Sequence, residues 1–168
     1  MVILSLDAST TSTGWAVFHD GLLLDYGCIK PQGEGWRDRL IHQDTLISDL
    51  IIRYRPNQII VEDVPLKSSN AKVLIILGAV QGFLCGLVAR HGLTINFVPP
   101  STWRSSIGLF TGDREGTTRK ELKRKSVEKA NKIFGLNLRW VSMNSGKNDD
   151  DISDAILLGY YWWCEYGR

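Results

Sequence analysis

The chain of 168 residues has few cysteines, and their spacing does not suit cross-linking. Cys28, Cys85 and Cys164 are odd in number and form no CxxC pair. This excludes a dense disulfide framework and a four-cysteine zinc site, and it favours a reducing compartment. The N-terminus also lacks the basic start and the long apolar core of a signal peptide, so we expect a cytoplasmic protein.

Net charge is also nearly absent. Twenty Lys and Arg offset 18 Asp and Glu, which leaves a formal charge of +2. The total charge therefore does not point to a nucleic-acid partner, and any basic surface must be local. The uncharged stretch 73–89 has only the minimum length of a membrane span and contains Gln81 and three glycines, so we expect no membrane span.

Apolar runs of strand length alternate with longer helical patterns. The first strand is expected at 2–9, and two more between 13 and 30 are joined at Asp20-Gly21, a strong hairpin signal. Helical and strand patterns then alternate, and the sequence predicts one mixed α/β domain over residues 1–168 with a central sheet. The helices are expected at 36–54, about 69–91, about 117–134 and after the acidic cluster at 149–154, the later strands at 57–64 and 94–100, and a mobile loop at 137–151.

The second helical stretch carries glycines at a spacing of four, Gly78, Gly82 and Gly86. They line one helical face and allow another backbone to approach closely. Each costs about 1 kcal/mol relative to alanine, which suggests a compensating contact. Two interpretations stay open, tight packing on the protein's own sheet or pairing with the same helix of a second copy.

Two acids follow apolar strands directly. Asp7 ends the first strand, and Glu62 ends the strand "IIVE". Functional groups of α/β sheets gather at the carboxyl ends of strands, although Asp7 could also serve the turn in "STTST". Two such acids side by side would repel each other and raise their pKa values unless a cation lies between them. Oxygen ligands of this kind suit magnesium or manganese.

The stretch "NDDDISDA" adds a third group of acids, at the start of the last helix. Asn148, Asp149 or Asp150 is expected to cap this helix, since acids suit its N-terminus. Asp154 lies one turn further in, ahead of apolar residues, where an acid needs a partner or a metal. Helical spacing pairs it equally well with Asp150 or Asp151. Together with the strand-end acids, such a pair could hold two divalent ions about 3.5 to 4 Å apart for phosphodiester hydrolysis.

A basic segment supplies a candidate nucleic-acid surface. Residues 119–132 hold seven Lys or Arg against Glu121 and Glu128, a local balance of +5. Such a run is often only a solvated helix face, but beside a carboxylate cluster it would neutralise phosphates. On a loop in "PPSTWRSSIG", Trp103 and Arg104 suit stacking on a base or clamping a phosphate.

These residues together resemble the RuvC-type Holliday-junction resolvases of the RNase H-like fold. "LDASTTSTGWAVF" resembles the first hairpin of that family, with Asp7, Thr13 and Gly14, and Glu62 falls at its second acid. "DISDA" resembles the closing Asp-x-x-Asp-Ala motif. The resemblance implies a five-stranded mixed sheet, a three-strand antiparallel meander plus two parallel strands, flanked by helices. It selects Asp151 over Asp150, so that the implied catalytic and metal-binding residues are Asp7, Glu62, Asp151 and Asp154.

The resemblance also implies a homodimer that cuts four-way DNA junctions with Mg²⁺ or Mn²⁺, two ions per site. The glycine stripe Gly78, Gly82 and Gly86 would then lie at the dimer interface. DNA contacts are expected from Trp103 and from the basic residues Arg104, Arg119, Lys120, Lys123 and Arg124.

The chain departs from the cellular enzymes in three places. Ser9 replaces a small glycine, Pro65 and Leu66 stand where a base-stacking phenylalanine is expected, and 111–118 has no counterpart. These departures favour a divergent or phage-encoded member that also cuts forks and flaps; in the phage case it would act in the host cytoplasm.

Other functions are weighed against this one. "DASTTSTG" also resembles the phosphate hairpin of sugar-kinase and actin-like ATPases, but those need two domains of about 150 residues each. A non-catalytic module for branched nucleic acid and a ribosomal-RNA-processing nuclease of the same fold are the remaining alternatives.

Overall fold

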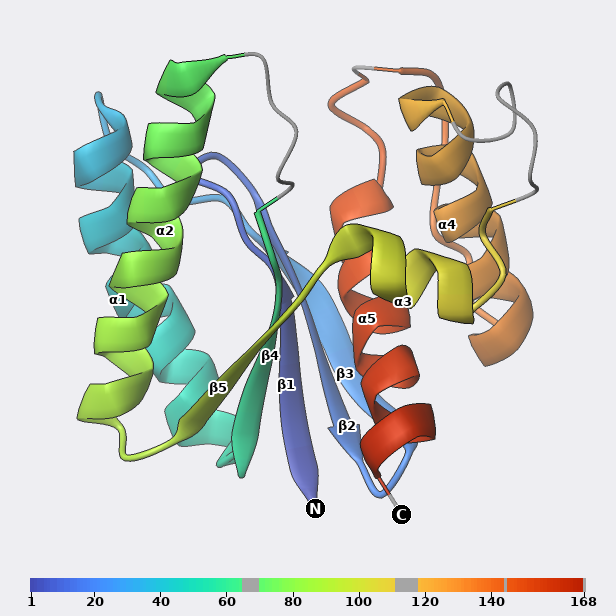
Figure 1. Cartoon of the computed structure of the whole chain (residues 1–168), viewed down its shortest axis with the longest axis horizontal. Coiled ribbons are helices and arrows are strands. Elements are labelled where there is room, and N and C mark those ends of the chain that lie inside the picture. The colour runs from blue at the N-terminus through green and yellow to red at the C-terminus, as the bar shows by residue number, and fades with distance from the viewer. Residues whose placement is uncertain (65–69, 111–117, 144, 168) are drawn as a thin grey trace.

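The computed structural model describes residues 1–64, 70–110, 118–143 and 145–167, and its strands form one mixed five-stranded sheet (Figure 1). The order across the sheet is β3-β2-β1-β4-β5. β1, β2 and β3 form an antiparallel meander, and β4 and β5 run parallel to β1, as predicted. The strands are β1 Val2–Asp7, β2 Thr13–His19, β3 Leu22–Ile29, β4 Gln58–Glu62 and β5 Thr94–Val98.

Helices cover both faces of this sheet. Figure 1 shows α1 (Trp36–Tyr54) and α2 (Ala71–Arg90) on one face and the remaining helices on the other. Those are α3 Pro100–Ser106, α4 Arg119–Phe134 and α5 Asp150–Tyr166. The hairpin predicted at Asp20-Gly21 is confirmed, and both residues have positive φ, 48° and 82°. Two of the three expected departures from the family, Pro65 with Leu66 and nearly all of 111–118, lie outside the described residues.

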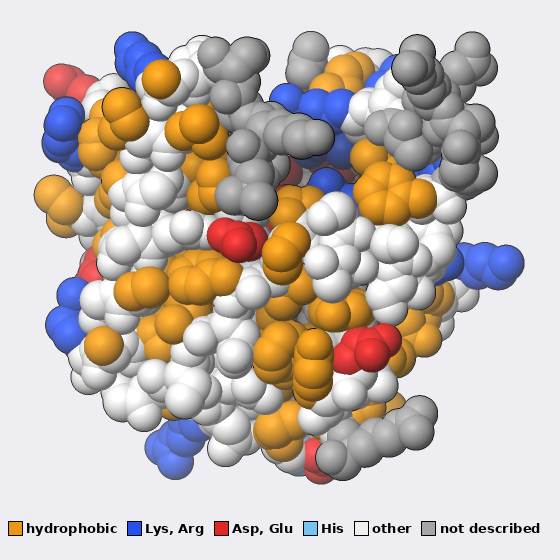
Figure 2. Space-filling model, viewed as in Figure 1, with side chains coloured by type: hydrophobic (Ala, Val, Ile, Leu, Met, Phe, Trp, Pro, Cys, Tyr) orange, Lys and Arg blue, Asp and Glu red, His pale blue; other side chains and the backbone are white. Residues whose placement is uncertain are grey.

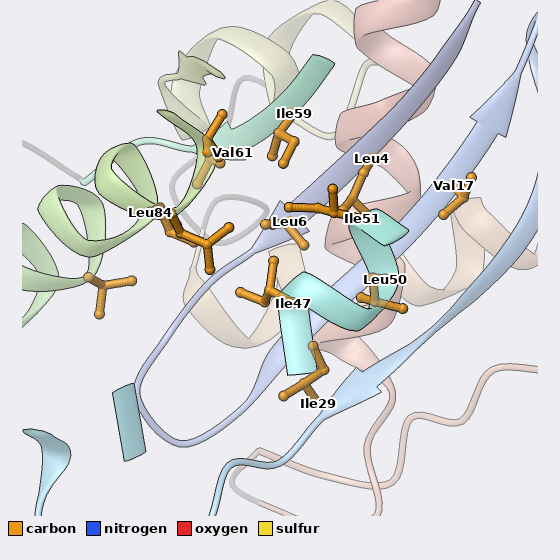
Figure 3. Packing of buried hydrophobic residues seen from close by; sticks show 13 residues of the cluster. Leu4, Leu6, Val17, Ile29, Ile47, Leu50, Ile51, Ile59, Val61 and Leu84 are labelled. Carbon is orange, nitrogen blue, oxygen red and sulfur yellow. The ribbon is translucent and has the colours of Figure 1, made fainter. Parts of the chain in front are cut away.

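Strand alternation divides the core into two clusters. Leu4 and Leu6 of β1 point to the α1–α2 side, while Ile3 and Ser5 point to the α5 side. Figure 3 shows the first cluster, in which β1 and β4 side chains meet those of α1 and α2; its labelled members include Leu4, Leu6, Ile47, Leu50, Ile51, Ile59, Val61 and Leu84.

The α5 side has closer backbone packing. A Cβ on Gly159 would lie 2.6 Å from the Phe18 ring and 2.7 Å from the Ser5 hydroxyl, so only glycine fits there. Ser5 Oγ donates to the carbonyl of Ala155 at 2.7 Å. These contacts hold the start of α5 against β1 and β2, and thereby fix the position of its acids.

One helix was not predicted. The segment after β5 was expected to be a loop, but Pro100–Ser106 forms α3. The prediction was wrong because this helix has only seven residues, too few for an apolar period, and its stability comes from burial of Trp103. Pro100 at its first position has the φ that a helix start needs.

The glycine stripe of α2 faces away from the sheet. A Cβ built on Gly78, Gly82 or Gly86 would meet nothing within 4 Å, so tight packing on the protein's own sheet is wrong. Val73 and Ile75 of the same helix are also exposed. By length and composition alone α2 could cross a membrane, but it packs into the core through Val80, Leu84, Leu87 and Val88.

Candidate active site

The parallel strands bring the first two acids together. Leu6 of β1 lies opposite Val61 of β4, so the next residues, Asp7 and Glu62, are neighbours at the carboxyl edge of the sheet. Asp63 is turned away, since its carboxylate accepts from Gln81 Nε2 at 2.6 Å. The strand ends thus bring two acids to the same edge of the sheet, as the sequence predicts.

Helix α5 brings the other acids to the same edge. A Cβ on Gly14, which pairs with Asp7 across β1 and β2, would lie 1.8 Å from the Asp151 carbonyl oxygen. The Thr-Gly of the first hairpin therefore admits the first turn of α5 into direct contact with the strand. Ser12 Oγ donates to the Asp151 carboxylate from the loop between β1 and β2.

Asp154 is almost fully buried, with 3% of its surface exposed. Its carboxylate accepts from Ser126 Oγ of α4 and from Arg104 Nη2 of α3, the latter at 3.0 Å. The expectation that an acid among apolar neighbours needs a partner is confirmed, and two neighbouring helices supply the donors.

The surroundings of the strand-end acids disfavour their charged forms. Burial raises the pKa of Asp7 well above its ordinary value, and the carboxylates of Glu62, Asp154 and Asp151 raise it further, while Lys123 opposes them. Burial also raises the pKa of Glu62, to about 7, against the lowering effect of Arg104. Within the described part of the chain, the Asp7 carboxylate has no hydrogen-bond or ion-pair partner.

Helix α3 places an arginine among these acids. Arg104 Nη2 lies 3.2 Å from Glu62 Oε2 and 3.0 Å from Asp154 Oδ2. Burial lowers the pKa of Arg104, but the carboxylates of Asp154, Glu62 and Asp7 raise it more, so the net shift is upward. Arg104 thus acts as an internal counter-ion that joins the strand half of the site to the helix half.

Trp103 has a different role from the predicted one. It has no exposed surface, and its Nε1 donates to Glu62 Oε2 at 2.8 Å. The prediction that it stacks on DNA from a loop is wrong in this structure, because the indole is part of the core under α3. It fixes the orientation of the Glu62 carboxylate instead.

Asp149 and Asp150 do not have the capping role that the sequence predicted. Asp149 is the N-cap residue of α5, but its carboxylate accepts from the Arg139 N–H at 2.8 Å and caps no helix N–H. Asp150, another candidate cap residue, is instead the first residue of the helix. It is 9% exposed and ion-paired with Lys123, whose Nζ also lies 3.7 Å from Asp151 Oδ1.

A divalent metal fits the chemistry of Asp7, Glu62, Asp151 and Asp154, which offer only oxygen donors around an unpartnered carboxylate. In this structure, the four carboxylates do not surround a single point. No group of three His, Cys, Asp or Glu among the described residues is spaced to hold an ion. Arg104 and the two serines bind these carboxylates in the positions that the structure records.

The basic residues of α4 lie in three environments. Arg119 and Lys120 are exposed on its first turn, and Lys123 reaches into the site. Arg124 is ion-paired along its own helix with Glu121, at 2.7 Å, and with Glu128. In Figure 2, Lys and Arg side chains gather at the upper edge of the molecule near α4. Their contact with DNA stays a prediction.

Several contributors to the site were missed from the sequence. Ser12 and Ser126 are ordinary loop and helix residues by composition, and only the fold brings them to Asp151 and Asp154. A cavity beside Asp151 also includes Trp140 and Lys147 of the loop predicted to be mobile. The one available signal was the tryptophan of this loop, Trp140.

Comparison with known proteins agrees with this geometry. The family model of the crossover junction endodeoxyribonuclease RuvC matches residues 3–121, which include Asp7, Glu62 and Arg104 but not α5. RuvC of Oleidesulfovibrio alaskensis is 26% identical over 120 residues, 68% of this chain and 72% of the relative. RuvC of Sphingopyxis alaskensis is 30% identical over 129 residues, 69% of this chain and 77% of the relative.

Solved structures extend the likeness of fold to α5. Thermus thermophilus RuvC in complex with a Holliday junction substrate superposes with a TM-score of 0.73 at 15% identity, over 99% of this chain and 96% of that one. The fowlpox virus resolvase with its substrate Holliday junction DNA gives a TM-score of 0.61 at 18% identity, over 100% of both chains. Since the family model covers well over half of the sequence and the fold agrees throughout, the chain belongs to the RuvC family of crossover junction endodeoxyribonucleases, with their RNase H-like fold.

Proposed function

We propose that this nuclease resolves four-way DNA junctions, and also cuts forks and flaps, through Asp7, Glu62, Asp151 and Asp154 as its catalytic, metal-binding residues. The observation that carries this is the presence of four acids from three elements at one partly buried edge of the sheet, where Asp7 has no hydrogen-bond or ion-pair partner among the described residues. The ions are Mg²⁺ or Mn²⁺, two per site, because only oxygen donors are offered.

When bound, the ions would supply positive charge to activate the attacking water and to stabilise the leaving 3′-oxygen. The protein's own residues orient the carboxylates and neutralise part of their charge. Ser12 and Ser126 fix the carboxylates of Asp151 and Asp154, and Trp103 fixes Glu62. Arg104 balances Glu62 and Asp154 while no cation is bound, and it lies where it can meet the negative charge of a scissile phosphate.

DNA binding is assigned to Arg104, Arg119, Lys120, Lys123 and Arg124. The positions of these residues support the assignment. Four of them lie on α4, which packs against α5 at the carboxylate edge, and Lys123 reaches into the site. Affinity for a junction should fall steeply as salt concentration rises, because bound phosphates release counter-ions. A flat salt response would remove α4 from the DNA-binding surface.

We further propose a homodimer paired through Gly78, Gly82 and Gly86, so that two sites cut one junction symmetrically. The glycines line an exposed apolar face of α2 with nothing within 4 Å of their Cβ positions. Gly82→Lys should give a monomer in sedimentation, whereas Ile133→Lys, an exposed position on α4 across the sheet, should stay dimeric. A dimer that survives Gly82→Lys would contradict this interface.

Residues 1–168 are taken as a single nuclease domain, and a cytoplasmic location is proposed from the free cysteines Cys28, Cys85 and Cys164. In a phage-encoded member the cytoplasm would be that of the host.

The function is tested by incubating the protein with a synthetic four-way junction, a fork, a flap and a linear duplex, with and without Mg²⁺. We expect metal-dependent cuts in the branched DNAs and none in the duplex. Asp7→Asn should bind the junction without cutting it, whereas Asp49→Asn, an exposed position on α1, should cut normally. Binding without cleavage by the unaltered protein would indicate a non-catalytic module, and preferred cleavage of structured RNA would indicate an RNA-processing nuclease.

A further inference from the structure

A cavity of about 490 Å³ opens beside the carboxylate edge. It is bounded by the β1–β2 loop, the end of β3, the first turn of α4, the start of α5 and the loop at 137–149. Ser12 and Asp151, which belong to the candidate active site, are also part of its wall. Its volume lies in the range of about 300 to 1,000 Å³ typical of small-molecule sites.

The loop at 137–149 is held in place by its own hydrogen bonds. The Asp149 N–H donates to the Arg139 carbonyl at 2.9 Å, and the Arg139 N–H donates to the Asp149 carboxylate at 2.8 Å. Asn148 spans the loop, since its Oδ1 accepts from the Val141 N–H at 2.9 Å and its Nδ2 donates to the Ser142 carbonyl at 2.7 Å. The sequence predicted a mobile loop, but the described part of this loop is held by internal hydrogen bonds, and Trp140 of this loop lines the cavity.

The cavity wall combines apolar side chains with positively and negatively charged ones. The partly exposed Trp140 and Met143 offer apolar surface, and four cations stand around the rim, namely Lys30, Arg119, Arg139 and Lys147, besides Lys123 at the inner end. In the described chain, Lys30, Arg119 and Lys147 form no ion pair, and Arg139 reaches only Asp149, at 3.7 Å. Asp150 and Asp151 make the inner end acidic.

We propose that this cavity receives one unpaired nucleotide of the substrate strand, next to the scissile phosphate, with its base on Trp140 and its phosphates on the cationic rim. An aromatic face beside unpaired cations is the combination that binds single-stranded nucleic acid. Stacked duplex bases cannot enter a cavity of this kind, whereas branch points hold bases that unstack at lower cost. The acidic inner end directs the phosphates outwards. The proposal rests on the proposed function, and it gives a reason for selecting branched DNA over duplex.

The test is an abasic scan of a four-way junction, with binding measured in the Asp7→Asn background and cleavage measured in the unaltered protein. Trp140→Ala should weaken junction binding by roughly 5- to 150-fold, the range for one stacked base, and Trp140→Phe should restore most of it. Removal of the base at one position near the cut should weaken junction binding by the parent protein by a similar factor. The same removal should not weaken junction binding by Trp140→Ala any further. Melting curves show whether each variant is folded.

The cationic rim is tested by charge removal. Lys147→Ala should reduce the slope of log affinity against log salt by about 1, whereas Lys132→Ala, on α4 outside the cavity wall, should leave the pocket-dependent abasic effect unchanged. If no abasic position couples to Trp140 while the unaltered protein still cuts junctions, the pocket proposal falls and the nuclease function stands. Binding of a free deoxynucleoside 5′-monophosphate through Trp140, without any coupled abasic position, would overturn it in favour of a free nucleotide ligand.

Discussion

The two halves of the carboxylate cluster are satisfied in different ways. On the helix side, Asp151 and Asp154 accept hydrogen bonds from Ser12, Ser126 and Arg104. On the sheet side, Asp7 has no partner among the described residues, and the pKa values of Asp7 and Glu62 are raised by burial. Glu62 accepts from Trp103 and shares Arg104 with Asp154, so the difference indicates that Asp7 is the acid of the cluster that the described protein leaves without a hydrogen-bond or ion-pair partner.

The largest effect should come from removing that charge. Asp7→Asn should lower junction cleavage by about 10³-fold or more, because several kcal/mol of metal-derived transition-state stabilisation are lost. The folded protein should not become less stable, since the partly buried Asp7 carboxylate has no hydrogen-bond or ion-pair partner among the described residues to lose. Single-turnover cleavage and a thermal melt measure the two quantities. Equal cleavage by the variant and the parent would show that Asp7 is no metal ligand.

On the helix side, Asp150 and Asp151 can be told apart. Asp151→Asn should resemble Asp7→Asn, whereas Asp150→Asn, which breaks only the ion pair with Lys123, should lower cleavage by about tenfold or less. The matched pair of variants is assayed on one junction at saturating Mg²⁺. The reverse order of effects would move the metal ligand to Asp150.

The contact that joins the two halves should be sensitive to one methyl group. Gly14→Ala would place a Cβ 1.8 Å from the Asp151 carbonyl, so the first turn of α5 must move away from β2. We expect a loss of about 1 to 3 kcal/mol in the free energy of unfolding. Cleavage should fall more than melting predicts, because Asp151 moves from Asp7. Gly92→Ala is a useful comparison, since a Cβ there meets nothing, although its positive φ of 67° adds some strain.

The last expected effect is a pH dependence of stability. The folded pKa of Glu62 is about 7 against an ordinary 4.5, so the folded protein binds more protons between these values. The contribution of Glu62 to the free energy of unfolding should therefore be largest below pH 4.5 and fall by about 3 kcal/mol as pH rises to 7. Asp7, Asp154, Arg104 and Lys123 surround the Glu62 carboxyl and act on it electrostatically.

Metal binding should reverse this loss at neutral pH, because a cation stabilises the ionised carboxylate. Melting curves at pH 5 and 7, with and without Mg²⁺, test the point, and Glu62→Gln is the control that should lose most of the slope. A stability that rises from pH 4.5 to 7 without metal would contradict the assigned environment of Glu62.

Local signals were sufficient for much of the fold and part of the site. The turn at Asp20-Gly21 and the acids at strand ends follow from short stretches, and both are as predicted. The burial of Asp150 and the inward position of Trp103 were not predictable, because each depends on a residue far along the chain, Lys123 or Glu62. The cavity around Trp140 was not predictable either, because its wall is formed by five separate segments of the chain.

The most direct test of the account is calorimetric titration of the DNA-free protein with Mn²⁺ at pH 7, in parallel with Asp7→Asn. The account predicts that the parent binds metal with release of protons from the raised carboxyls, and that the variant loses at least one ion per site. Unchanged stoichiometry and affinity in Asp7→Asn would contradict the claim that the sheet half of the cluster holds the metal.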